Sequence, residues 1–208
     1  MRKIILALMV FGAGLSAIAQ DKYGLDDGNA RAARRQKSMS AWQKDMDEFK
    51  ARSAQDHQLS ALADSLASVQ GRAALVNQDF VLEATSVTFK NGTTTYVNST
   101  TNFISLKGNK AVVQISPSSF TSGPNGVGGV TVEGYVSDLV VRTDSKGRTT
   151  LSMNVMGIGI NAQVEVYMYP DTNKASATVY PNFNSNTIWL RGIIVPYQNS
   201  NVFEGNSL

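Results

Sequence analysis

The stretch TLSMNVMGIGINAQVEVYMYPDTNKASATVY, from Thr150 to Tyr180, decides the fold class of this chain. Apolar and polar residues alternate along it in three successive runs, which are separated by Met156-Gly157 and by Pro170-Asp171-Thr172-Asn173. An alternation with a period of two places alternate side chains on opposite faces of an extended strand. Each run therefore predicts a half-buried antiparallel strand, and each break predicts a turn.

The same β texture, rich in Thr, Val, Ile, Ser, Asn and Tyr, extends over the whole chain from Asp79 onward. Further strands are predicted at Phe80–Lys90, Thr93–Val97, Asn102–Leu106, Ala111–Ile115, Gly129–Arg142 and Thr187–Val195. Within the long run that starts at Gly129 the apolar parity switches, which predicts a β-bulge near Ser137-Asp138. Eight or nine short strands with no helix pattern between them predict an antiparallel β-sandwich or a small up-and-down barrel.

Residues 20–77 have a different composition, with no proline and only two glycines between Asp26 and Val76. Apolar residues recur there at a spacing of three and four, at Met39, Trp42, Met46 and Phe49, and again at Leu59, Leu62, Leu66, Val69, Ala73 and Val76. Each set forms one apolar stripe on a helix. The two sets are out of phase, which predicts a break near Ser53–Asp56 and hence one interrupted helix or two helices.

These apolar stripes need a partner. They could pack on each other, on the β domain, or on another copy of the chain. Fewer than three full heptads in each phase are short for a free-standing coiled coil, so packing within the chain is favoured.

The N-terminal residues MRKIILALMVFGAGLSAIAQ combine a basic pair, an apolar run and a small-x-small ending at Ala17-Ile18-Ala19. The apolar run is too short for a stable membrane anchor, so residues 1–19 are predicted to be a secretory signal peptide that is cleaved near Ala19. No later stretch is apolar enough to span a membrane. We therefore expect a periplasmic or secreted protein with no transmembrane segment after cleavage.

The charge balance argues against nucleic acid as a partner. Removal of Arg2 and Lys3 lowers the count of basic residues from 19 to 17, against 16 acidic residues. A nucleic-acid-binding domain needs a clustered basic face, which a nearly neutral chain of this kind does not predict.

The residues that usually carry chemistry are scarce. The chain has no cysteine and one histidine, His57, so neither a zinc set nor a Ser-His-Asp triad is predicted. We expect no cofactor, no metal and no catalytic residue, and an enzyme is the less favoured interpretation. The alternative is a hydrolase that uses Glu133 and Glu165, because glycosidases need two carboxylates about 5–10 Å apart.

A polar sheet face is the stronger candidate. Hairpin registers set by the turns predict two outward rows of residues, Glu165–Thr178–Trp189 and Tyr167–Ser176–Arg191. Exposed Trp, Tyr and Arg are typical of contact sites, so this face could bind a glycan, a peptide or an envelope protein. The competing and favoured interpretation is that the helical segment covers the face, with Trp189 and Tyr167 packed against Leu62 or Trp42.

The glycine-rich stretch TSGPNGVGGVTVEG, from Thr121 to Gly134, resembles a phosphate-binding loop at first sight. No Gly-Lys-Ser/Thr closes it, and a β run follows where a helix should start, so it is not a P-loop. Its Pro-Asn-Gly core predicts a tight turn, and Asn125 and Gly126 at that turn are further candidate binding residues. Gly128-Gly129 allows a close backbone approach before the strand begins.

Four blocks of the sequence, in order, are similar to recurring blocks of a known family. They are STTNFISLKGNKAVVQI, GPNGVGGVTVEG, MNVMGIGINAQVEVYMYP and VYPNFNSNTIWLRGIIVPYQNSNVFEG. The chain resembles the domain of unknown function 4251 family over roughly Gln78 to Leu208, without the helical segment. The resemblance implies an exported protein of the Bacteroidetes type with a β-rich domain. It supplies no activity, cofactor or catalytic residue.

Together these observations predict a signal peptide (1–19), a helical segment (20–77) and an antiparallel β domain (78–208). The favoured function is a non-enzymatic binding or interaction module of the bacterial envelope. The first alternative is an envelope structural or assembly factor that acts through the helical segment. The second is the hydrolase with paired carboxylates.

Overall fold

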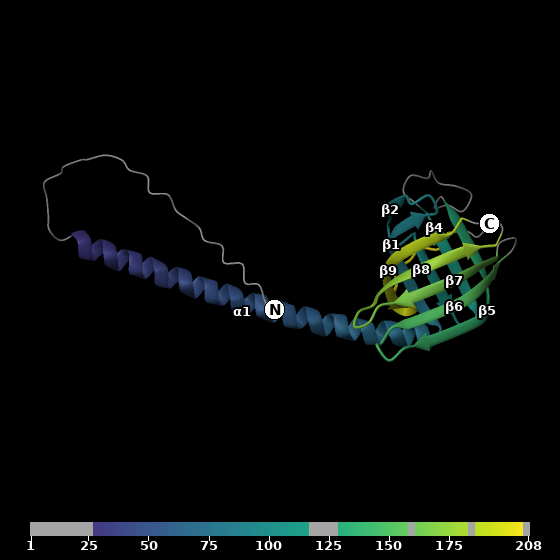
Figure 1. Ribbon diagram of the computed structural model, residues 1–208, viewed down its shortest axis with the longest axis horizontal. Helices are drawn as coiled ribbons and strands as arrows, with labels where there is room; N and C mark the ends of the chain where they lie inside the picture. The colour runs from purple at the N-terminus through teal and green to yellow at the C-terminus, as the bar shows by residue number, and fades with distance from the viewer. Residues whose placement is uncertain (1–26, 117–128, 158–160, 183–185, 206–208) are drawn as a thin grey trace. The chain divides into compact units, whose positions relative to one another are not determined.

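The computed structural model describes residues 27–116, 129–157, 161–182 and 186–205 (Figure 1). The chain divides into two units, Met1–Ser53 and Ala54–Leu208, and all strands lie in the second. Its elements are the helix α1 (Asp27–Val76), the strands β1 (Asp79–Phe89), β2 (Thr94–Tyr96), β3 (Phe103–Lys107), β4 (Lys110–Ile115), β5 (Val130–Thr143), β6 (Thr149–Gly157), β7 (Asn161–Met168), β8 (Lys174–Pro181) and β9 (Ile188–Pro196), and the 3-10 helix η1 (Tyr197–Asn199).

The strands form a closed antiparallel barrel, which decides between the two predicted architectures. The sheet order is β2-β1-β3-β4-β5-β6-β7-β8-β9, and β9 pairs back onto β1 along Phe80–Phe89. Eight of the nine strands make the barrel, while the short β2 continues beside β1 at Ser86–Thr88, beyond the part of β1 that pairs with β3. Closure gives each of the eight described barrel strands a neighbour on both sides.

The interior of the barrel holds the apolar set of each alternating run. The register aligns Leu151 of β6, Val166 of β7, Ala177 of β8 and Leu190 of β9 across four neighbouring strands, and all four are buried. The predicted alternation is thereby confirmed. In a barrel of eight strands such side chains are expected to fill the interior.

The predicted bulge in the long strand is also confirmed. The pairing of β5 with β6 shifts register between Ser137 and Val140, and Asp138 has a φ of 54°. One extra residue on β5 explains why the apolar parity of that strand changes along its length.

The helical segment is one continuous helix, so the predicted break near Ser53–Asp56 is wrong. The residues around this position, KARSAQDHQ, include neither proline nor glycine. Nothing in them interrupts the backbone hydrogen bonds of the helix. The apolar pattern changes phase there, but the helical backbone continues without interruption.

The helix meets the barrel through two small residues and Leu75, rather than through the stripe from Leu59 to Val76. Ser68, Gly71 and Leu75 are buried, and Leu75 joins the barrel core. A Cβ added at Gly71 would lie 3.2 Å from the Sδ atom of Met168 and 3.4 Å from the carbonyl oxygen of Ile194. Ser68, Gly71 and Leu75 lie on one face of the helix in successive turns. The last turns of α1 therefore run across one end of the barrel.

The predicted stripe from Leu59 to Val76 faces solvent, contrary to the expectation that it packs within the chain. Leu62 is 68% exposed and Val69 is 62% exposed. The barrel already contains its own apolar filling, and contact through Gly71 brings the helix backbone close to it. A leucine in the place of Gly71 would not fit at that distance.

The C-terminal tail, residues 197–205, covers one side of the barrel. Val81, Phe103 and Val112 form a second buried cluster on the outside, against which Val195, Tyr197 and Val202 pack. The outer surface over β1, β3 and β4 is thus largely buried beneath the tail.

The buried amide of Gln114 holds this tail in place. Its Nε2 atom donates hydrogen bonds to the carbonyl oxygens of Thr101 (3.0 Å) and Phe203 (2.9 Å). Its Oε1 atom accepts from the backbone N–H of Gly205 (2.8 Å) and from the hydroxyl of Thr131 (3.0 Å). A single side chain therefore satisfies four polar groups of the tail and its surroundings.

We expect Gln114→Leu to lower the free energy of unfolding by about 3 kcal/mol or more, because it leaves several buried polar groups unpaired. Gln163→Leu is the matched control, since Gln163 is exposed and its replacement should change stability by about 0.5 kcal/mol or less. Urea denaturation of both variants measures the difference. Equal stability of the two variants would contradict the assigned role of Gln114.

Candidate binding face

The register confirms both predicted outward rows on β7, β8 and β9. Glu165 pairs with Thr178, which pairs with Trp189, and one step along Tyr167 pairs with Ser176. Ser176 in turn pairs with Arg191. The predicted aromatic, cationic and acidic side chains therefore do lie side by side on the outside of the barrel.

From Ala54 onward the helix does not cover these rows, and the favoured interpretation that Trp189 packs against Leu62 is wrong. Trp189 is 40% exposed, and Glu165 and Arg191 are exposed. Leu62, the expected packing partner, itself faces solvent. The reason is that the barrel-facing part of α1 lies against the barrel end, whereas the rows lie on its side.

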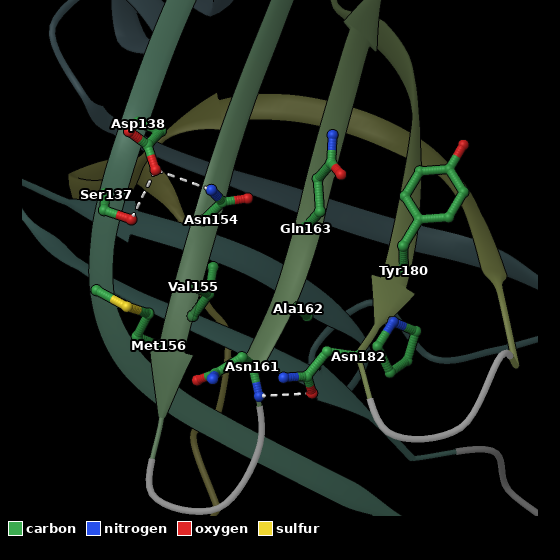
Figure 2. A pocket seen from close by; sticks show the side chains of 11 residues that line it. Ser137, Asp138, Asn154, Val155, Met156, Asn161, Ala162, Gln163, Tyr180 and Asn182 are labelled. Atoms are coloured by element: carbon green, nitrogen blue, oxygen red, sulfur yellow. Dashed lines mark hydrogen bonds between the residues drawn. The ribbon is translucent and has the colours of Figure 1, made fainter.

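A third row, which the sequence analysis did not single out, lines a groove on the same side. Ser137 of β5 pairs with Asn154 of β6, Asn154 with Gln163 of β7, and Gln163 with Tyr180 of β8. The groove has a volume of about 480 Å³. Figure 2 shows Asn154, Gln163 and Tyr180 side by side along it, with Asp138 at one end. We call the three rows together the binding face.

Hydrogen bonds hold several groove side chains in position. The Oδ2 atom of Asp138 accepts from the hydroxyl of Ser137 (3.2 Å) and from Nδ2 of Asn154 (3.0 Å) (Figure 2). Nε2 of Gln163 donates to Oε1 of Glu165 at 3.2 Å, which links the groove to the neighbouring row. The bulge of β5 is what brings the Asp138 carboxylate to the groove, because it alters the direction of that strand's side chains.

The groove therefore presents flat polar groups next to an aromatic ring. Carboxamides offer a donor and an acceptor side by side, and a carboxylate accepts through two oxygens. Tyr180 is 41% exposed and adds an apolar face with a polar tip. Away from the groove, at the end of β7 and just beyond it, Tyr167 and Tyr169 form an edge-to-face pair with ring centroids 4.9 Å apart. Such a surface can bind a ligand that carries both hydroxyls and C–H faces.

One ion pair borders the second row. The Arg148 guanidinium lowers the pKa of Asp144, and Asp144 together with the Tyr167 hydroxyl raises the pKa of Arg148. Both side chains belong to the turn between β5 and β6, where Oδ1 of Asp144 also accepts from the backbone N–H of Lys146 and Arg148. Arg148 is thus held by the turn.

The hydrolase pair is not brought together. Glu165 aligns through Ser152 with Val140, whereas Glu133 lies seven residues earlier on β5. Allowing for the bulge, this places the two carboxylates roughly 20 Å apart along the strands, far beyond glycosidase spacing. Glu133 instead forms an ion pair with Lys110 and raises its pKa.

The predicted loop residues Asn125 and Gly126 lie outside the described residues. Gly129, at the edge of that stretch, has a φ of +73°, and a Cβ there would lie 2.0 Å from the carbonyl oxygen of Ile115. The predicted close approach is confirmed for this glycine. In the described ranges, no group of three or more His, Cys, Asp or Glu side chains could hold a metal ion.

The groove could have been found from sequence in part. The hairpin registers that predict the row through Glu165 also place Asn154, Gln163 and Tyr180 together, one row along. Asp138 carried no such signal, because its position depends on the detailed geometry of the bulge.

The fold and the face define the class of protein: a closed antiparallel barrel with an N-terminal helix across one end and a polar, aromatic outer face. The model of the family named domain of unknown function 4251 matches residues 64–194. The chain belongs to this family.

A solved relative supports the same assignment. The crystal structure of a DUF4251 family protein from Bacteroides eggerthii is 43% identical and aligns with a TM-score of 0.60, covering 69% of this chain and 96% of that chain. None of the curated proteins matches the chain. Within the described residues, no helix is long and apolar enough to cross a membrane.

The family region begins inside the helix, at Asp64, earlier than the expected Gln78. The structure explains the difference, since Ser68, Gly71 and Leu75 pack against the barrel and its core. The last turns of α1 are therefore part of the β domain in physical terms.

Because the binding face is uncovered, Trp189→Ala should lower the free energy of unfolding by only about 1–2 kcal/mol. The neighbouring change Leu190→Ala should lower it by about 3–5 kcal/mol, because Leu190 is fully buried in the barrel core. Thermal and urea denaturation would compare the two. A loss for Trp189→Ala as large as that for Leu190→Ala would show that the face is packed against another segment.

Proposed function

We propose that this protein is an exported, non-enzymatic binding module of the bacterial envelope, and that its binding face holds a neutral glycan. The observation that carries the proposal is the groove on the outside of β5–β8, with Asp138, Asn154 and Gln163 beside Tyr180. The two neighbouring rows extend the contact surface toward Trp189 and Arg191.

The chemistry of the groove favours a sugar. Each sugar hydroxyl both donates and accepts, and neighbouring hydroxyls match the paired groups of a carboxamide or carboxylate. The C–H face of a pyranose ring is apolar and suits the ring face of Tyr180. None of the eleven lining residues that the structure describes is Lys or Arg, so the described lining does not favour an anionic ligand.

The dimensions of the groove suit a sugar ligand as well. A volume of about 480 Å³ falls within the range of roughly 300–1,000 Å³ that is typical of small-molecule sites. The groove is an open feature of the barrel side, so a chain of sugars can continue past it along the rows. An exposed site of this kind buries only part of its ligand, and we expect affinities in the micromolar to millimolar range.

The matched pair Tyr180→Ala and Tyr169→Ala tests the proposal. The two tyrosines are 41% and 40% exposed, and only Tyr180 lines the groove. Glycan arrays with residues 20–208 would identify a neutral ligand, and calorimetry would measure its affinity. We expect Tyr180→Ala to weaken binding at least about tenfold, and Tyr169→Ala to leave it within about twofold. Gln163→Ala should weaken binding as well.

Two outcomes would contradict the proposal. One is that no neutral glycan is retained by the folded protein. The other is that a glycan is retained but Tyr180→Ala and Tyr169→Ala affect it equally, which would place the site elsewhere.

Export rests on the N-terminal sequence. We expect the protein isolated from the bacterial envelope or medium to begin at Gln20, because Ala17-Ile18-Ala19 ends the apolar run as a signal-peptidase site does. Mass spectrometry of the N-terminal peptide after cell fractionation measures this. A cytoplasmic protein that retains Met1–Ala19 would contradict export.

A further inference from the structure

The helix carries an apolar surface that the barrel does not use. We call it the outer stripe; its members are Leu59, Leu62, Leu66, Val69, Ala73 and Val76. All six are exposed, with Leu62 at 68% and Val76 at 55%. In the last turns of the helix the barrel contacts the opposite side, through Ser68, Gly71 and Leu75. The outer stripe is therefore accessible from the side away from the barrel.

The spacing of the outer stripe is the spacing of a helix–helix contact. Its intervals are three, four, three, four and three residues, which keeps every member on one line along the helix. Over 18 residues the line is about 27 Å long. Exposed apolar lines of this kind mark surfaces that bind another helix.

We propose that the outer stripe binds the outer stripe of a second copy of this chain, in antiparallel orientation. In that orientation each leucine faces a smaller side chain of the partner. Leu59 meets the partner's Val76, Leu62 meets the partner's Ala73, and Leu66 meets the partner's Val69. In a parallel pair, leucines would face leucines at one end of the stripe, and a gap would remain where the two copies of Ala73 meet. Pairing a larger side chain with a smaller one fills the space between the helices better.

The residues beside the outer stripe fit a pair of identical copies. Gln58, Ala63, Ser65 and Gln70 flank it, and none of them carries a charge. Two copies can thus approach without repulsion between like charges, which would otherwise oppose self-association. Arg72 also lies near the stripe, but its Nη2 atom donates to the carbonyl oxygen of Gly147 on the barrel side.

Anchoring on the barrel offsets the shortness of the contact. Isolated helices of this length are marginal, because the helix itself must first be ordered. Here Gly71 and Leu75 are held by the barrel, so the turns that carry Val69, Ala73 and Val76 are already formed before a partner arrives. A preorganised surface loses less conformational entropy on binding.

Sedimentation of residues 20–208 over the micromolar to millimolar range tests the association. We expect a concentration-dependent dimer for the unmodified protein and a monomer for Leu62→Glu/Leu66→Glu. Ser60→Glu/Ala61→Glu is the matched control, since these exposed residues lie off the stripe on the same turns, and it should still dimerise. All three proteins should have the same Tm in the monomeric range, because none of the changed side chains is buried.

Cysteine cross-linking tests the orientation of the two helices. Because the natural chain has no cysteine, only the introduced residues can form a disulfide. A mixture of Leu62→Cys and Ala73→Cys proteins should form a disulfide-linked dimer, because these positions face each other in the antiparallel pair. Each variant alone should form far less.

Three results would overturn the proposal. The unmodified protein could remain a monomer throughout the concentration range. It could remain a monomer and instead bind phosphatidylcholine vesicles through the same leucines. Finally, Leu62→Cys alone could cross-link as well as the mixture, which would require a parallel pair.

Discussion

The pairing of β9 with β1 is the constraint on which the rest of the structure depends. It runs along Phe80–Phe89 and joins the last strand to the first. The contact is close at Gly192, where an added Cβ would lie 1.8 Å from the carbonyl oxygen of Glu83, next to the register shift between Ala84 and Ser86. A side chain there would push the two strands apart. Without this pairing, two long strand edges would be exposed and the apolar interior would open.

Closure also divides the outside of the barrel into surfaces with different roles. The tail covers β1, β3 and β4 and is held there by Gln114. The last turns of α1 lie across one end, with Leu75 inserted into the core. The binding face over β5–β9 and the outer stripe of the helix stay open. The glycan proposal and the self-association proposal concern these two open surfaces, and neither depends on the other.

The strands and part of the binding face could be predicted because they depend on local pattern. Alternation along 162–168 and 175–179 determines which side chains point outward, and short turns determine which residues pair, so the row Glu165–Thr178–Trp189 follows. The groove could be predicted less well, since Asp138 reaches it through the bulge geometry. The partner of the helix could not be predicted, because a spacing of three and four reveals an apolar stripe but not what it contacts.

By itself, the sequence determined the antiparallel strands, their inward and outward faces, the bulge near Ser137-Asp138 and the helical character of the segment before them. These features follow from periodicity and from residues adjacent in the chain. Only the tertiary structure decided between barrel and sandwich, and only it showed which helix face meets the barrel. Both depend on contacts between distant residues, β1 with β9 and Gly71 with Met168. At Gly71 the helix backbone lies close to the barrel and requires a small residue, whereas the outer stripe on the opposite side of the helix is left exposed.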